Sequence, residues 1–149
     1  MILRWLLATL HLLALPLGLG AIWTRARALA RASRSDGLAR IFVADNLWGF
    51  AAVLWIATGL WRAFGGVEKG SAYYLHDHAF GAKMGLLILI LLLELWPMTT
   101  LIRWRMQARR GSVLDIRLAP ALARISYAQA ALVILMVFAA TAVARGYFY

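Results

Sequence analysis

The sequence predicts an all-α membrane protein that crosses the bilayer with four helices packed as a four-transmembrane-helix bundle. Hydrophobic residues make up 64% of its 149 residues, and the mean hydropathy of +0.76 is too high for a soluble domain. Four apolar runs are each long enough to span a hydrocarbon core of ~30 Å. Most of the basic residues are arginines in the gaps between these runs. We expect a single domain over residues 1–149, with helices over about 2–24, 38–64, 77–104 and 119–144.

The first run, residues 2–24, is interpreted as a membrane helix and not as a cleaved signal peptide. A signal peptide carries its positive charge before the apolar run, whereas here only Arg4 precedes the run and several arginines follow it. Pro16 and Gly18 allow a bend and the close approach of a neighbouring helix. We expect the arginines that follow to contact lipid headgroups as a topology signal: Arg25, Arg27, Arg31, Arg34 and Arg40.

The second run, residues 38–64, carries Asp45 inside its apolar stretch. Small residues such as Ala52 and Gly59 follow on the same helix face. Small side chains let two helices approach closely, so we expect this face and Asp45 to point into the bundle.

The third run carries two ionisable residues well inside its apolar stretch, Lys83 and Glu94. They are 11 positions apart, and at about 100° per residue this spacing returns to nearly the same direction. Both side chains therefore project from one helix face, roughly 16 Å apart, and cannot form one ion pair. Charges at such depth are costly and usually face a bundle interior or a wet cavity, so this face is predicted to point inward. Pro97 can kink the helix beside Glu94.

The distribution of arginines predicts the orientation of the bundle. The connectors after the first and third runs carry five and six arginines, whereas the other side has only Arg4, Arg62, Lys69 and Arg145. By the positive-inside rule both connectors are cytoplasmic, and both termini face outward.

Depth in the membrane separates the polar residues into two levels. His11 and Lys83 fall in the outer half, about nine and five residues from the outer surface, and can be neighbours. The functional interpretation is a catalytic or cofactor-binding site of imidazole and amine in the outer half, above titratable carboxylates in the inner half. The inner half holds Asp45, Glu94, Tyr127 and Gln129.

Each of these residues also has a structural interpretation. His11 can be a polar contact between helices, and Lys83 can extend to the lipid headgroups. Asp45 and Glu94 can pair with Arg40 or Arg103 near the inner surface, or can be protonated and hydrogen-bonded.

Several other classes of site are not expected. The absence of cysteine excludes disulfides, thiolate metal sites and iron–sulfur clusters. No metal site is expected, because His76 and His78 lie beside Asp77 without a distant fourth ligand and are expected to be solvated. The arginines are explained by topology, so we expect lipid and not nucleic acid as the partner. No Ser/His/Asp set converges, which disfavours a nucleophilic hydrolase.

Short motifs spread over nearly the whole chain carry a resemblance to a known family. They are Asp45, Trp48-Gly49-Phe50-Ala51, Thr58-Gly59-Leu60-Trp61-Arg62, Gly65-Gly66, Lys69-Gly70, Tyr74, Phe80, Lys83, Pro97-Met98-Thr99, Arg103-Trp104 and Arg145-Gly146-Tyr147. They resemble the predicted bacterial inner-membrane proteins known as domain of unknown function 2214. The resemblance implies a compact four-helix bundle in a bacterial inner membrane and brings no established activity. In such a membrane the outward-facing termini given by the positive-inside rule are periplasmic.

A more distant similarity links the chain to HemJ-type protoporphyrinogen oxidases and CopD-like membrane proteins. These proteins share four-helix units with a histidine in the first helix and a lysine near the start of the third, which correspond here to His11 and Lys83. The similarity implies haem or porphyrin chemistry at these two residues. The Tyr-His pair late in the third helix of HemJ-type proteins is absent, and this chain has Glu94 to Pro97 there.

Three functions remain open from the sequence. The first is a redox protein that binds haem b or a porphyrin, with His11 as axial ligand and with Lys83 and Arg62 as further cofactor contacts. The second is a small proton-coupled transporter that uses Asp45 and Glu94 as proton or ion relay groups. The third is a non-catalytic, lipid-interacting or accessory subunit whose buried polar residues hold the bundle, or a homo-oligomer, together.

Overall fold

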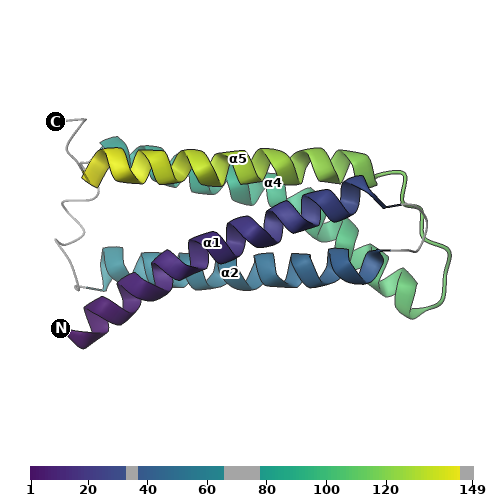
Figure 1. Ribbon diagram of the computed structural model, residues 1–149, viewed down its shortest axis with the longest axis horizontal. Coiled ribbons are helices and arrows are strands. Elements are labelled where there is room, and N and C mark those ends of the chain that lie inside the picture. The colour runs from purple at the N-terminus through teal and green to yellow at the C-terminus, as the bar shows by residue number, and fades with distance from the viewer. Residues whose placement is uncertain (33–36, 66–77, 145–149) are drawn as a thin grey trace.

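The structure is a computed structural model that describes residues 1–32, 37–65 and 78–144. Its helices are α1 (Ile2–Ala30), α2 (Leu38–Phe64), α4 (His78–Arg109) and α5 (Ala119–Ala144), as Figure 1 shows. All four are long and apolar enough to cross a membrane. The prediction of an all-α protein with four membrane-spanning helices is confirmed.

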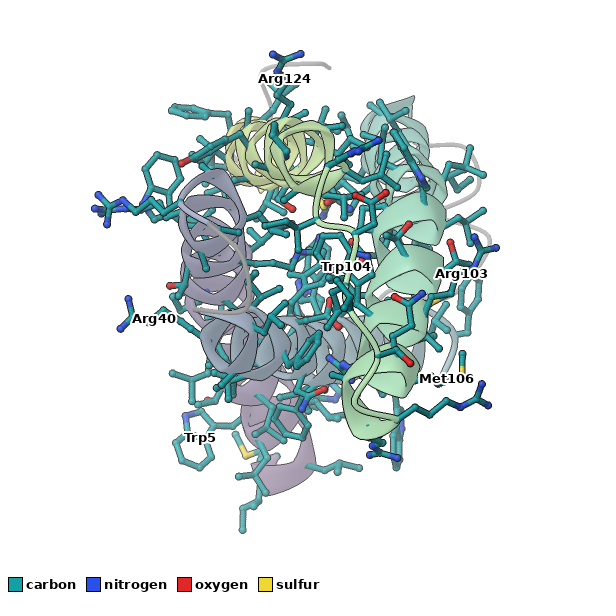
Figure 2. All side chains as sticks on the ribbon, turned by 90° about the vertical axis from the view of Figure 1, so that its right-hand side faces the viewer. Trp5, Arg40, Arg103, Trp104, Met106 and Arg124 are labelled. Atoms are coloured by element: carbon teal, nitrogen blue, oxygen red, sulfur yellow. The ribbon has the colours of Figure 1, made fainter. Side chains whose placement is uncertain are left out.

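The four helices run alternately up and down along one axis (Figure 1). The start of α1 and the end of α5 lie at one end, and the chain passes from α1 to α2 and from α4 to α5 at the other, the connector end. Viewed from the connector end in Figure 2, the helices surround a centre that holds Trp104. Helix α1 packs against α2 and α5, and α4 packs against α5.

Helices α2 and α4 approach each other less closely than these neighbouring pairs do. We call the side of the bundle between them the α2/α4 seam. It lies between Asp45, Ala52 and Ile56 on α2 and Leu87, Leu91 and Glu94 on α4.

Helix α1 is longer than the predicted range of 2–24, because it continues to Ala30. Alanine and arginine have high helix propensity, so the Ala/Arg-rich segment after Trp23 continues the helix without a break. Helix α4 likewise extends past the predicted residue 104 to Arg109. The extension of α1 places Arg25 inside a helix and not in a connector.

Two apolar clusters fill the bundle at different heights. The connector-end cluster is centred on Trp104 and consists of Leu29, Leu38, Ile41, Leu101, Trp104, Ala119, Leu122 and Ala123. The mid-bundle cluster consists of Ala21, Ile22, Trp48, Ile90, Ala130, Val133 and Met136. Large apolar side chains such as Leu13, Phe50 and Phe138 are instead exposed on the outside, as expected of a surface that faces lipid.

Candidate functional site

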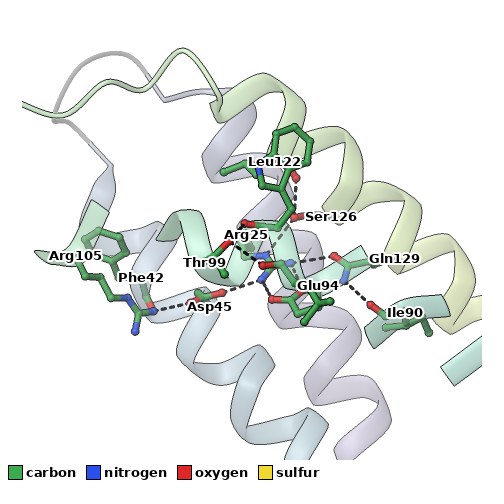
Figure 3. A network of polar contacts seen from close by, with 12 residues as sticks. Arg25, Phe42, Asp45, Ile90, Glu94, Thr99, Arg105, Leu122, Ser126 and Gln129 are labelled. Carbon is green, nitrogen blue, oxygen red and sulfur yellow. Dashed lines mark hydrogen bonds and ion pairs between the residues drawn. The ribbon is translucent and has the colours of Figure 1, made fainter. Parts of the chain in front are cut away.

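The polar centre of the bundle is Arg25, whose side chain is fully buried on α1. A guanidinium has five N–H donors, and each has an acceptor here. Nε donates to Ser126 Oγ at 3.2 Å, and Nη1 donates to Asp45 Oδ1 at 2.8 Å and to Glu94 Oε1 at 2.7 Å. Nη2 donates to Glu94 Oε2 at 2.8 Å and to Gln129 Oε1 at 3.0 Å. One side chain of α1 thus binds acceptors from the other three helices (Figure 3).

Gln129 and Ser126 connect the acceptors to the backbone. Gln129 Nε2 donates to Glu94 Oε2 at 2.8 Å and to the carbonyl of Ile90 at 3.2 Å. Ser126 Oγ donates to the carbonyl of Leu122 at 3.0 Å. These bonds orient the side chains of Ser126 and Gln129 independently of Arg25. The guanidinium therefore binds acceptors that are already in place.

Arg105 extends the cluster across the α2/α4 seam. Its Nη2 donates to Asp45 Oδ2 at 2.6 Å and to the carbonyl of Phe42 at 3.2 Å, and its guanidinium lies 5.2 Å from the centre of the Phe42 ring. Asp45 therefore bridges two arginines from different helices. We refer to Arg25, Asp45, Glu94, Arg105, Ser126 and Gln129 together as the Arg25 network.

The surroundings of the Arg25 network strengthen its ion pairs. Leu29 and Leu101 of the connector-end cluster lie on one side, and Ile22 and Ile90 of the mid-bundle cluster lie on the other. Low polarity increases the attraction between opposite charges and also the cost of leaving one unpaired. Two arginines and two carboxylates balance in charge, so the group can be buried as a neutral unit.

The structure corrects two predictions about these residues. Arg25 was predicted to contact lipid headgroups, but it is buried because α1 continues past residue 24. The structural interpretation of the carboxylates included pairing with Arg40 or Arg103, but Asp45 pairs with Arg25 and Arg105, and Glu94 with Arg25. Arg40 and Arg103 are exposed and point away from the bundle (Figure 2).

One signal in the sequence could have identified Arg25. The buried positions of α1 recur at intervals of four or seven residues, which places them on one helix face. They include Leu7, Ala14, Gly18, Ile22 and Leu29. Arg25 lies three residues after Ile22 and four before Leu29, so it is in phase with this buried stripe. The inward-facing Asp45 and Glu94 also required a cation, which this position supplies.

His11 lies further from the connector end and is packed against α2. Its Nδ1 is 2.9 Å from Thr58 Oγ1 and 3.1 Å from the carbonyl oxygen of Trp55. A carbonyl can only accept, so the contact with Trp55 is a hydrogen bond in the tautomer that carries its proton on Nδ1. The imidazole also stacks on the Trp55 indole with ring centres 5.5 Å apart, and Gly59 leaves room for it, since a Cβ there would lie 3.1 Å from Cε1.

Lys83, near the start of α4, and Arg62, near the end of α2, are both half-buried. His11 contacts Trp55 and Thr58 of α2, whereas Glu94 contacts Arg25 of α1 and Gln129 of α5. The use of Lys83 and Arg62 as cofactor contacts stays a prediction. Within residues 1–32, 37–65 and 78–144 there is no cluster of three potential metal ligands; His76 and Asp77 lie outside these ranges.

An apolar pocket separates the level of the Arg25 network from the level of His11. Its walls come from all four helices and carry only apolar and tryptophan side chains apart from one glycine. They are Ala14, Leu15, Gly18, Trp48, Ala51, Ala52, Trp55, Ile56, Leu87, Ile90, Leu91 and Val133.

Comparison with known proteins gives a family but no activity. No curated protein matches the chain, and no solved structure matches it. A family model described as "Predicted membrane protein (DUF2214)" matches residues 3–147. The match extends from the start of α1 to beyond the end of α5, and so covers the whole bundle. The chain therefore belongs to the DUF2214 family of predicted membrane proteins.

Proposed function

We propose that this protein is a non-catalytic, lipid-interacting membrane subunit whose four helices are held together by the Arg25 network. The observation that supports the proposal is that all five N–H donors of Arg25 have acceptors on α2, α4 and α5. A catalytic or substrate-binding arginine has to keep donors for its ligand. Arg25 directs all of its donors to its own chain.

The network acts between helices whose backbones make few direct contacts. Helices α2 and α4 are not closely packed, and Asp45 and Glu94 are joined across their seam by Arg25, with Arg105 as a second link. Removal of Arg25 leaves Glu94 unpaired in apolar surroundings, which costs about 3–5 kcal/mol for buried pairs. The network therefore adds polar links from α4 to α1 and α2 to the packing of α4 on α5.

This function fits the geometry better than proton-coupled transport by Asp45 and Glu94. The side chains of these carboxylates are 15% and 16% exposed, so protons could reach them from the seam. Beyond them, however, the path towards His11 is the apolar pocket, and the path towards the connector end is the cluster around Trp104. A relay of protons needs polar groups or water at hydrogen-bond spacing, which these apolar walls do not supply.

The experiment that separates these two functions uses Glu94→Gln. We expect this variant to lower the unfolding temperature of the purified protein, while proteoliposomes with wild-type protein show no pH-driven flux above empty vesicles. A wild-type flux that disappears in a Glu94→Gln variant of unchanged stability would establish the transporter instead. The exposed Gln107→Leu variant is the control for handling and reconstitution.

A haem or porphyrin site at His11 is the second candidate function. It is favoured by the Nδ1–H donated to the Trp55 carbonyl, because histidines that bind a metal through Nε2 commonly donate Nδ1–H to a backbone carbonyl. Lys83, near the start of α4, and Arg62, near the end of α2, are the cations that would meet the propionates. Expression with added haem should give a Soret band that His11→Ala abolishes. A protein without this band excludes the site.

We further propose that the connector end faces the cytoplasm of a bacterium, that both termini are periplasmic, and that the protein resides in the inner membrane. Support comes from eight exposed arginines near the connector end, even after Arg25 is assigned to the interior: Arg27, Arg31, Arg40, Arg103, Arg109, Arg110, Arg117 and Arg124. Assembly into a homo-oligomer through the apolar outer surface also stays a prediction.

A further inference from the structure

Helix α2 carries one uncharged polar residue, Asn46, on a face that the bundle leaves uncovered. Asn46 follows Asp45 of the Arg25 network in the chain, but its side chain is exposed. None of the other described residues hydrogen-bonds to this side chain. An amide has two N–H donors and a carbonyl acceptor, so Asn46 presents both kinds of group to the surroundings of the bundle.

The position of Asn46 along α2 places it inside the hydrocarbon core. Arg40 and Arg62 lie near the two ends of α2 and are 22 positions apart, which is ~33 Å of helix around a core of ~30 Å. Asn46 is six positions from Arg40, so it lies ~9 Å along the axis from that residue and ~7 Å inside a core centred between the two arginines. Its short side chain cannot extend to the headgroups as lysine and arginine do. Lipid chains offer no hydrogen-bond partner at this depth, and a second membrane helix does.

The exposed residues on both sides of Asn46 repeat like the seam of a coiled coil. They follow one another at alternating intervals of three and four residues, and all except Asn46 are apolar. We call them the α2 outer stripe: Val43, Asn46, Phe50, Val53, Ala57, Leu60 and Phe64. This spacing lets one helix pack along a second one with a crossing angle of about +20°, and a single asparagine in such a seam fixes the register of the two helices.

The chemistry of the α2 outer stripe favours an identical partner. Two copies related by a two-fold axis along the membrane normal have the same orientation, so their α2 helices are parallel and each residue of the stripe meets its own counterpart. An asparagine amide is complementary to itself, because each of two copies can donate an N–H to the carbonyl oxygen of the other. The stripe contains no charged residue, so two copies meet without repulsion.

We propose that two copies of this chain form a parallel dimer along the α2 outer stripe, in which Asn46 of one protomer hydrogen-bonds to Asn46 of the partner subunit. The inference rests on the homo-oligomer proposed above and names its surface. The Arg25 network lies inside each copy and takes no part in this contact.

Cross-linking in the membrane tests the surface. The chain has no cysteine, so Val53→Cys introduces a single thiol in the middle of the stripe. Two such thiols lie opposite each other in the proposed dimer, and copper phenanthroline should convert most of the protein in liposomes into a disulfide-linked dimer. Leu135→Cys is the control: Leu135 is exposed and lies 16 residues after the start of α5, much as Val53 lies 15 after the start of α2. Cross-linking of Leu135→Cys equal to that of Val53→Cys, or none at Val53→Cys, would overturn the proposal.

Dilution in lipid measures the contribution of Asn46 to the dimer. Protein labelled at Ser112→Cys, in the exposed α4–α5 connector, is diluted in liposomes, and energy transfer between labels gives the dissociation constant. Asn46→Leu should raise this constant about 3- to 10-fold, the effect of about one interhelical hydrogen bond in a membrane. Asn46→Gln keeps the amide and should raise it less, and Leu92→Ala, at an exposed position of α4, should leave it unchanged. Equal constants for the wild type and Asn46→Leu would contradict the assigned role of Asn46.

The outcome is separable from the role of the Arg25 network in stability. Asn46 is exposed, so Asn46→Leu should unfold at the same temperature as the wild type when both are diluted to monomers. A protein that stays monomeric at every dilution would overturn the dimer, whereas only the unfolding of Arg25 variants bears on the network. A dimer that forms without cross-links at Val53→Cys would overturn the α2 surface alone.

Discussion

Arg25 and Glu94 face each other across the bundle through two parallel hydrogen bonds, Nη1 to Oε1 at 2.7 Å and Nη2 to Oε2 at 2.8 Å. Only a planar guanidinium can pair with a carboxylate in this way while its remaining N–H groups point to other acceptors. The contact joins α1 to α4, two helices whose backbones make little direct contact. This pair therefore links α4 to α1, as the Arg105–Asp45 ion pair links α4 to α2.

The first prediction concerns the shape of the cation. Arg25→Lys keeps the positive charge but replaces five donors with three and cannot form the paired contact. We expect the unfolding free energy to fall by about 2 kcal/mol, measured by SDS titration in mixed micelles and followed by circular dichroism. Arg27→Lys, at an exposed position two residues away, should change it by less than about 0.5 kcal/mol. Equal stability of the two variants would show that charge alone is required.

Gln129 is predicted to be the most important neutral member of the network. It is fully buried, accepts from Arg25, and donates to Glu94 and to the Ile90 carbonyl. Gln129→Leu keeps the approximate size but leaves several buried groups without partners, at a cost of about 1–3 kcal/mol. The same titration measures the loss, with exposed Gln107→Leu as the matched control. A stability loss no greater than that of the control would remove Gln129 from the network.

Thr58 is predicted to position His11. Its hydroxyl donates to the Leu54 carbonyl at 2.7 Å and so is oriented to accept from His11 Nδ1 at 2.9 Å. Thr58→Val removes the acceptor and should cost about 1 kcal/mol, whereas Thr58→Ser keeps it and should cost less. Thermal unfolding followed by tryptophan fluorescence compares the two. If Ser and Val variants lose the same stability, packing of the Thr58 methyl group is what matters.

The four helices could be predicted from the sequence because an apolar run of bilayer length is a local property. The inward direction of Asp45 and Glu94 could be predicted for a similar reason, since a charge within such a run needs a polar neighbour. Their partners could not be predicted. The rotation of each helix against the next determines them, and Arg103 lies only two residues from Arg105 yet points outward.

Arg25 was missed for a different reason. A charge at the end of an apolar run is normally interfacial, and the predicted end of the first helix at residue 24 made this interpretation natural. Three residues before it, Ile22 is fully buried, so a helix that continues must carry Arg25 along the same stripe. The error therefore concerned the direction of the Arg25 side chain, which was assigned to the lipid headgroups and not to this buried stripe.

Orientation in the membrane gives a prediction that labelling can test. The chain has no cysteine, so one introduced cysteine is the only thiol. Ser112→Cys lies in the exposed α4–α5 connector, and Leu3→Cys lies near the start of α1 at the opposite end. In intact bacterial spheroplasts, a membrane-impermeant maleimide should label Leu3→Cys, and should label Ser112→Cys only after permeabilisation. The reverse pattern would invert the proposed orientation.

The measurement that tests the central claim most directly compares Arg25→Met with the double variant Arg25→Met, Glu94→Gln. The single variant strands Glu94 in apolar surroundings, whereas Asp45 keeps its ion pair with Arg105, and it should lose about 3–5 kcal/mol of unfolding free energy. The double variant has no stranded carboxylate and should regain at least half of that loss. A single variant as stable as the wild type, or a double variant less stable than the single one, would contradict the claim that these charges hold the bundle together.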